Sequence, residues 1–267
     1  MGRLVSGAAL DIGRNPKRPT NQDRLAVFEP LAPDCPDHLY LVCDGMGGHL
    51  HGEIASGIAT KEIPKAYRDA RRNATVEEAL RAAVSEAHQS IRRHSENLNL
   101  AGRMGTTAVA AAVAGRELTV ANVGDSRAYL VRAGEIRQIS KDHSRAAEVK
   151  ELALQGEAAS IGRNELTRSL SAGRELVEPD LFVEQFGDGD ALVLCSDGLW
   201  SCVSDAGILS VVDQLSPDSA AQKLVQMANR AGGPDNISVI VVRNGDRAVE
   251  RIEDDTGEFE VLSPGTP

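Results

Sequence analysis

The chain has 267 residues, of which 42% are hydrophobic and 25% are charged, and its formal net charge is −10. This composition is typical of a globular protein, and the acidity argues against a general nucleic-acid binder, which needs a broad basic face. No apolar run reaches the roughly 20 residues that span a bilayer, and the amino-terminal segment lacks the long apolar stretch of a secretion signal. We therefore expect a cytoplasmic protein that binds neither nucleic acid nor membrane.

The first half of the chain predicts strands at residues 4–12, 24–29 and 38–43, followed by two helices. The first helix covers residues 52–70, where Pro64 either kinks it or ends it. The second begins at a capping box formed by Thr75 and Glu78, and its apolar residues recur at spacings of three and four.

The second half predicts three strands at residues 106–114, 117–123 and 126–132, which must be antiparallel because their connections are so short. A helix at 144–155 and an exposed excursion at 156–174 precede strands at 181–186 and 190–195. Helices from about residue 205 and after Ser216 lead to a last strand at 237–243. These groups predict an α+β fold in which two antiparallel sheets pack face to face and helices cover their outer surfaces.

Five aspartate-bearing segments are scattered along the chain, and several of them follow an apolar run that ends at a turn. In LYLVCDG and ALVLCSDG a buried strand ends in an acid followed by glycine, which would deliver carboxylates from separate strands to one end of a sheet. Magnesium and manganese prefer oxygen ligands, and two such cations roughly 4 Å apart can activate a water and neutralise a phosphate dianion. The ordered set therefore predicts a metal-dependent phosphate-ester hydrolase. The segments are NQD (21–23), DGMGGH (44–49), GDSR (124–127), SDG (196–198) and PDN (234–236).

Arg18 lies five residues before Asp23, and its planar guanidinium suits bidentate binding of phosphate oxygens. The alternative is that Arg18 is a solvated loop residue. Gly45 has no Cβ, so its carbonyl could turn toward a cation beside Asp44. The four cysteines form no CxxC pair and are expected to be buried and reduced.

Four further side chains are given ordinary roles. His49 and His51 form an HxH pair, but nothing nearby supplies the remaining ligands of a zinc site. His143 is expected to be structural, and Trp200 to belong to the core rather than to bind a ligand.

At this point the ordered segments are recognisable. RPTNQD, DGMGGHLHGE, MGTTAVAA, NVGDSRAYL, SKDHS, LTRSL, LCSDGLW and GGPDNISVIVV resemble, in the same order, those of the protein phosphatase 2C family, the metal-dependent PPM class. The DGMGG and NQD forms look like those of bacterial members, and the resemblance runs from about Ser6 to Arg243. It implies an α-β-β-α sandwich, two catalytic manganese or magnesium ions, and phosphoserine or phosphothreonine proteins as substrates.

The resemblance also assigns roles to individual residues. It puts Asp44 between the two metals, with the Gly45 carbonyl on one of them, while Asp197 and Asp235 complete the first metal site. Asp23 matches a residue that holds metal-bound waters.

Other positions of the family's pattern have a supporting role. Arg18 matches the phosphate-binding arginine, and Asp125 matches the acid that helps to bind a third, weaker metal, with Asp197 as co-ligand. Asn236 follows the last ligand and would support it, as would Thr106 and Thr107 near the site.

Two departures from the family matter. Met46 stands where many eukaryotic members carry a histidine, proposed there as the general acid, so another group must protonate the leaving alkoxide. The flap, at about residues 144–165, is also shorter than usual.

Predictions of the domain bounds, the partners and the cellular location complete the expectation. Residues 1–243 would form a single catalytic domain, followed by an acidic and disordered tail at 244–267. We expect a monomer that acts in signal transduction on the substrates of a serine/threonine kinase. Two alternatives remain open: a catalytically silent phosphoprotein-binding module of the same fold, and a small-molecule phosphomonoesterase.

Overall fold

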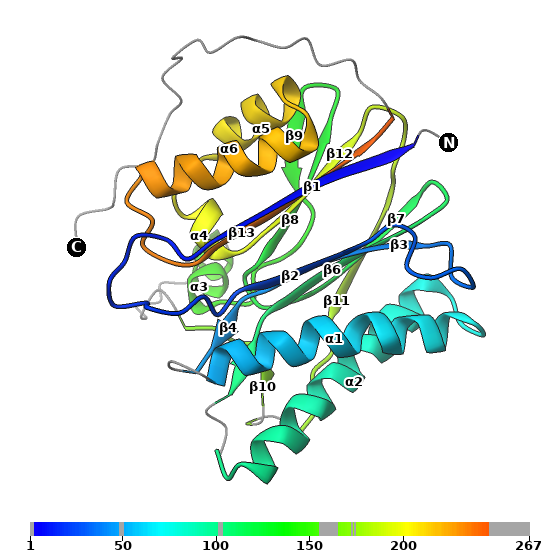
Figure 1. The fold of residues 1–267 in the computed structure, drawn as a ribbon, viewed down its shortest axis with the longest axis vertical. Helices are drawn as coiled ribbons and strands as arrows, with labels where there is room; N and C mark the ends of the chain where they lie inside the picture. The colour runs from blue at the N-terminus through cyan, green and yellow to red at the C-terminus, as the bar shows by residue number, and fades with distance from the viewer. Residues whose placement is uncertain are drawn as a thin grey trace.

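Two five-stranded antiparallel sheets pack face to face, and helices cover their outer surfaces (Figure 1). The computed structural model of the chain describes residues 3–47, 51–100, 104–154, 165–171, 173 and 175–245. In this part of the chain the α-β-β-α arrangement that we expected is confirmed.

Each large sheet combines strands from both halves of the chain, which brings distant segments side by side. The first sheet has the order β1 (Leu4–Asp11), β13 (Ile237–Asn244), β12 (Ala191–Cys195), β8 (Arg127–Arg132) and β9 (Glu135–Gln138). The second has the order β11 (Asp180–Gln185), β7 (Glu117–Val123), β6 (Ala108–Ala114), β3 (His38–Cys43) and β2 (Arg24–Phe28). A small third sheet consists of β10 (Leu170–Ser171), β5 (Gly105–Thr106) and β4 (Gly45–Met46).

The helices lie in pairs on the two outer faces. Helices α1 (His51–Arg71) and α2 (Val76–Asn97) cover the second sheet, while α5 (Asp205–Gln214) and α6 (Pro217–Arg230) cover the first (Figure 1). Two others, α3 (Arg145–Leu154) and α4 (Asp197–Trp200), lie near the end of the sheets that carries the acidic turns (Figure 1). No helix of the described residues is both long enough and apolar enough to cross a membrane.

The central strands are apolar on both faces because each sheet is covered on both sides. In β3, Leu39 and Leu41 pack under α1 and α2, whereas Tyr40 and Val42 point into the layer between the sheets. The other central strands alternate in the same way, since successive side chains of a strand point to opposite faces. The result is three hydrophobic layers, which hold the strand ends in fixed positions.

The local predictions were mostly confirmed, with some differences. The capping box at the start of α2 is present, since the Thr75 hydroxyl accepts from the Glu78 amide and the Glu78 carboxylate accepts from the Thr75 amide. Pro64 lies inside α1, so the alternative that it ends the helix is wrong. The strand predicted at 106–114 is divided into β5 and β6 at Thr107, whose amide donates to the Asp44 carbonyl at 2.8 Å.

All four cysteines are free and buried, as expected. Four short elements were not predicted: β4, β9, β10 and α4. The HxH pair cannot be judged, because His49 lies outside the described residues. The same holds for residues 155–164 of the flap and residues 246–267 of the tail.

Candidate active site

The acidic turns converge at one end of the two sheets. Asp23 directly precedes β2 and Asp44 directly follows β3, and these strands pair antiparallel, so both acids lie at the same end. Asp197 follows β12 and Asp235 precedes β13 in a second antiparallel pair. Asp125 follows the end of β7. The structure therefore brings together the carboxylates that the strand-acid-glycine pattern predicted to meet.

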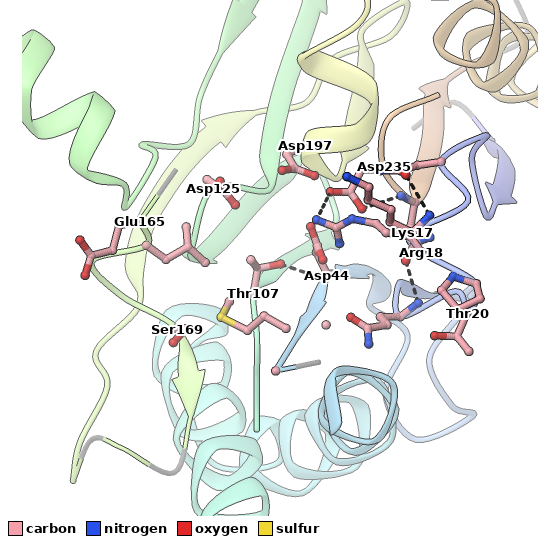
Figure 2. A pocket seen from close by; sticks show the side chains of 18 residues that line it. Lys17, Arg18, Thr20, Asp44, Thr107, Asp125, Glu165, Ser169, Asp197 and Asp235 are labelled. Atoms are coloured by element: carbon pink, nitrogen blue, oxygen red, sulfur yellow. Dashed lines mark hydrogen bonds and ion pairs between the residues drawn. The ribbon is translucent and has the colours of Figure 1, made fainter. Parts of the chain in front are cut away.

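A cavity of about 900 Å³ opens at this end. Four of the predicted aspartates line it, as Figure 2 shows: Asp44, Asp125, Asp197 and Asp235. Gly45, Met46, Thr107 and Asn236 also line the cavity, and no histidine does so among the described residues. The methionine thus reaches the site but brings no proton donor.

Asp23 lies behind the cavity and not in its wall, and its side chain is fully buried. Its Oδ2 atom accepts hydrogen bonds from the Ser238 hydroxyl at 2.6 Å and from the Ser196 hydroxyl at 2.7 Å. Burial raises the pKa of Asp23 to about 6, although the two serine hydroxyls lower it. Ser196 belongs to the SDG segment, but neither serine was assigned a role from the sequence, because only the fold brings Ser196 and Ser238 to Asp23.

The carboxylates are mutually destabilising as anions. Burial raises the pKa of Asp44 well above its usual range, and the charges of all four other aspartates raise it further. Burial and the charge of Asp197 raise the pKa of Asp125 to about 7 and that of Asp235 to about 6. A cluster of this kind is stable as anions only when positive charge is brought to it.

The donor set suits hard divalent cations. It consists of oxygen atoms, and both Asp23 Oδ1 and Asp197 Oδ1 are buried without a hydrogen-bond partner among the described residues. As the side chains stand, no group of three His, Cys, Asp or Glu residues in the described part of the chain is arranged to hold a metal ion. Arg18 supplies the nearest positive charge instead, through an ion pair of 2.7 Å between its Nη2 and Asp235 Oδ2.

Gly45 is required by close packing. A Cβ on Gly45 would lie 2.2 Å from the carbonyl oxygen of Gly52, so the first turn of α1 could not approach β4. This contact, in addition to the freedom of its carbonyl, explains why glycine follows Asp44. The Asp44 backbone is also fixed, because its amide donates to the Thr107 hydroxyl at 2.9 Å and its carbonyl accepts from the Thr106 hydroxyl at 2.9 Å.

Asp125 is held by a network that the sequence did not predict. The Trp200 indole Nε1–H donates to the Asp125 carbonyl at 2.9 Å, and the Arg127 guanidinium lies 3.7 Å from the centre of the Trp200 ring. His143 is buried, accepts at Nδ1 from the Gly124 amide, and is hydrogen-bonded at Nε2 to Asp180. His143 is therefore structural, as expected, whereas Trp200 is half-buried beside the core rather than inside it, and both rings hold the turn that presents Asp125.

Asn236 links the loop that carries Arg18 to the loop that carries Asp235. Its Oδ1 accepts from the Gln22 amide at 2.8 Å and its Nδ2 donates to the Ile12 carbonyl at 2.9 Å. The two bonds fasten both ends of the loop at residues 12–22, so the supporting role expected for Asn236 has a geometric basis.

A family model described as protein phosphatase 2C matches residues 18–237. The chain belongs to the protein phosphatase 2C family. The matched segment contains every residue that the sequence assigned to the site, from Arg18 to Asp235.

Two curated bacterial phosphatases are similar to the chain over most of its length. The serine/threonine phosphatase stp of Listeria monocytogenes (strain EGD-e) is 35% identical over 83% of this chain and 89% of its own length. The protein phosphatase PhpP of Streptococcus pneumoniae is 31% identical over 90% of this chain and 97% of its own length.

Solved structures of bacterial phosphatases share the fold. The Mycobacterium tuberculosis serine/threonine phosphatase PstP/Ppp has a TM-score of 0.78 and 33% identity, over 91% of this chain and 99% of that one. The catalytic domain of PstP in complex with two manganese ions has a TM-score of 0.71 and 31% identity, over 91% and 99%.

Proposed function

We propose the following roles for the site residues of this metal-dependent serine/threonine protein phosphatase. Asp44, the Gly45 carbonyl, Asp197 and Asp235 hold two manganese or magnesium ions, and Arg18 binds the substrate phosphate. The family and the curated relatives support the activity on phosphoproteins. The observation that carries the assignment of residues is the convergence of four aspartates on one cavity, with Asp23 buried behind them, in an arrangement where each of the other four raises the pKa of Asp44.

Asp44 is the best candidate for a ligand shared by two cations. Its pKa is raised by each of the other four aspartates, so it lies at the electrostatic centre of the cluster. Divalent cations at this place would supply an activated water and neutralise the phosphate dianion. The charge of Asp197 raises the pKa of Asp125, so the two carboxylates repel each other as anions. This repulsion supports a third, weaker metal site between them. Asp23 lies deeper and would act through water.

Arg18 presents a planar fork at the cavity wall. In the structure this fork engages Asp235, and cations bound to the aspartates would remove its electrostatic reason to stay there. We propose that it then turns to the phosphoryl oxygens, which match its bidentate geometry.

The test combines turnover with direct measurement of metal binding. Hydrolysis of a phosphothreonine peptide and calorimetric titration with Mn²⁺ should be compared for the natural protein, Asp44→Ala and the control Asp69→Ala, which changes an exposed aspartate outside the cavity. We expect millimolar metal dependence, loss of activity in EDTA, and loss of both metal binding and turnover in Asp44→Ala alone. Full activity in EDTA, or unchanged Mn²⁺ binding by Asp44→Ala, would contradict the assignment.

The remaining predictions belong to the same proposal, with one change of bounds: Asn244 is the buried last residue of β13, so the domain includes it and the acidic tail begins after it rather than at 244. They are a single catalytic domain with a flap at about 144–165, a monomeric state, a cytoplasmic location and signalling opposite a serine/threonine kinase. Deletion of residues 246–267 is expected to leave metal-dependent turnover intact, and sedimentation of the protein should give the mass of one chain.

A further inference from the structure

The cavity carries opposite charges at two ends. Figure 2 shows Lys17 and Arg18 on one side, Glu165 on the other, and Asp44 with Thr107 between them. Lys17 and Arg18 are the cationic residues that line the cavity in the described part of the chain. Because Arg18 is paired with Asp235, Lys17 supplies the uncommitted positive charge on that side.

Lys17 is presented by a rigid turn. Its amide donates to Asn15 Oδ1 at 3.0 Å, and the Arg18 amide donates to the Asn15 carbonyl at 3.0 Å. Asn15 is itself fastened to the loop of Asp235, because its Nδ2 donates to the Pro234 carbonyl at 2.9 Å. The exposed Lys17 ammonium forms no ion pair or hydrogen bond with a described residue, so it is available to a ligand.

Glu165 is presented at the base of the flap. Its carbonyl accepts from the Arg145 amide at 2.8 Å, and the next residue, Leu166, forms a β-bridge with Ser144. The exposed Glu165 carboxylate has no hydrogen bond or ion pair with the described residues. Glu165 lines the cavity on the side opposite Lys17, so the two charges cannot serve the same ligand group (Figure 2).

The cavity has room for more than a phosphorylated side chain. Its volume of about 900 Å³ is in the upper part of the range for sites that enclose drug-sized ligands. Residues next to the phosphoresidue can therefore reach its ends. An acidic neighbour would be attracted to Lys17 and repelled by Glu165, whereas a basic neighbour would be attracted to Glu165 and repelled by Lys17.

We propose that Lys17 binds an acidic group, a carboxylate or a second phosphate, on one flank of the phosphoresidue, while Glu165 binds a basic side chain on the other flank. This selectivity rests on the proposed function of the same site. The phosphatase then prefers phosphopeptides that carry an acidic residue on one flank of the phosphoresidue and a basic residue on the other. A peptide with the same two residues exchanged is a poorer substrate.

The experiment measures kcat/KM for phosphothreonine peptides that carry an aspartate, a phosphoserine or a lysine at single positions on either flank, each divided by the value for a neutral peptide. For the natural protein we expect a preference of about twofold to fivefold for an acid on one flank, the range for an exposed ion pair. Lys17→Glu should reverse this ratio, and Glu165→Lys should reverse the preference for lysine on the other flank. High salt should weaken both preferences.

Two variants control for net charge. Lys65→Glu changes a lysine whose side chain is 72% exposed on α1, and Glu135→Lys changes an exposed residue on β9, both outside the cavity. Both should keep the natural ratios. Equal hydrolysis of all the peptides by the natural protein, or equal shifts in the controls, would overturn the inference and leave the phosphatase function intact. Failure to hydrolyse any phosphopeptide with Mn²⁺ would overturn both.

Discussion

Replacing Ser238 with alanine should weaken manganese binding while the fold is kept. The Ser238 hydroxyl lies 2.6 Å from Asp23 Oδ2, and the change removes one oxygen atom from a fully buried position on β13. The Ser238 amide, which donates to the Ser196 hydroxyl, is unaffected by the change. The main effect is therefore the loss of one donor to the Asp23 carboxylate.

The magnitude follows from the charge of the acceptor. A hydrogen bond to a charged group contributes about 1.5–3 kcal/mol. Because this bond favours the ionised form of Asp23, its loss raises the pKa of a carboxylate that already titrates at about 6. Since about 1.4 kcal/mol corresponds to a factor of ten, loss of this hydrogen bond would weaken the binding of a cation coordinated directly by Asp23 by at most about 10- to 150-fold. Asp23 acts through water in our proposal, so we expect the lower end, about tenfold.

Calorimetric titration with Mn²⁺ measures the effect without turnover. Ser95→Ala is a matched control, because Ser95 is also buried but its hydroxyl has no hydrogen-bond partner among the described residues. Ser238→Ala should bind Mn²⁺ about tenfold more weakly than both Ser95→Ala and the natural protein. Equal affinity in all three proteins would refute the reasoning that the buried hydroxyls keep Asp23 ionised for the metal site.

Three further predictions follow from the site. Arg18→Ala should raise KM for a phosphopeptide markedly, and Arg18→Lys should restore little, because an ammonium lacks the bidentate fork; an unchanged kcat/KM would return Arg18 to the solvated-loop alternative. Trp200→Phe keeps an aromatic ring beside Arg127 but removes the donor to the Asp125 carbonyl, so urea unfolding should show a loss of at least about 1 kcal/mol, and no loss would contradict the contact. In EDTA the protein should lose stability as pH rises from 3.8 toward about 7, because the folded state binds protons on Asp23, Asp125 and Asp235 more tightly than the unfolded chain does; unfolding midpoints that rise over this range would contradict it.

The large elements could be predicted because their patterns are strong and local. β3 after His38 and all of β12 are unbroken apolar runs, as strands covered on both faces must be, and each is followed within two residues by an acid. The capping box fixed the start of α2 within one residue. The same signals located the aspartates, since burying a carboxylate at the end of a strand costs free energy unless a cation or a hydrogen-bond donor stabilises it.

The supporting contacts could not be predicted, because they depend on the approach of distant segments. Ser238 meets Asp23 across 215 positions of sequence, and Trp200 meets Asp125 across 75. The strands β4 and β10 have two residues each, too few to show an alternating pattern. Gly45 was interpreted through its carbonyl, whereas its contact with Gly52 becomes visible only when α1 is placed against β4.

The acidic end of the sheets departs from the rules that the rest of the molecule follows. Elsewhere the layers are apolar and densely packed, whereas here buried carboxylates raise one another's pKa values. The protein offsets part of this cost with its own groups: the hydroxyls of Ser196 and Ser238 on Asp23, and the guanidinium of Arg18 on Asp235. Among the described residues, no hydroxyl or guanidinium is hydrogen-bonded to the Asp44 carboxylate in this way. The backbone of Asp44 is fixed by Thr106 and Thr107, but its carboxylate, whose pKa is raised by burial and by the four other aspartates, relies on what the cavity binds. The residue left most in need of positive charge is thus the one that the family's pattern places between two cations.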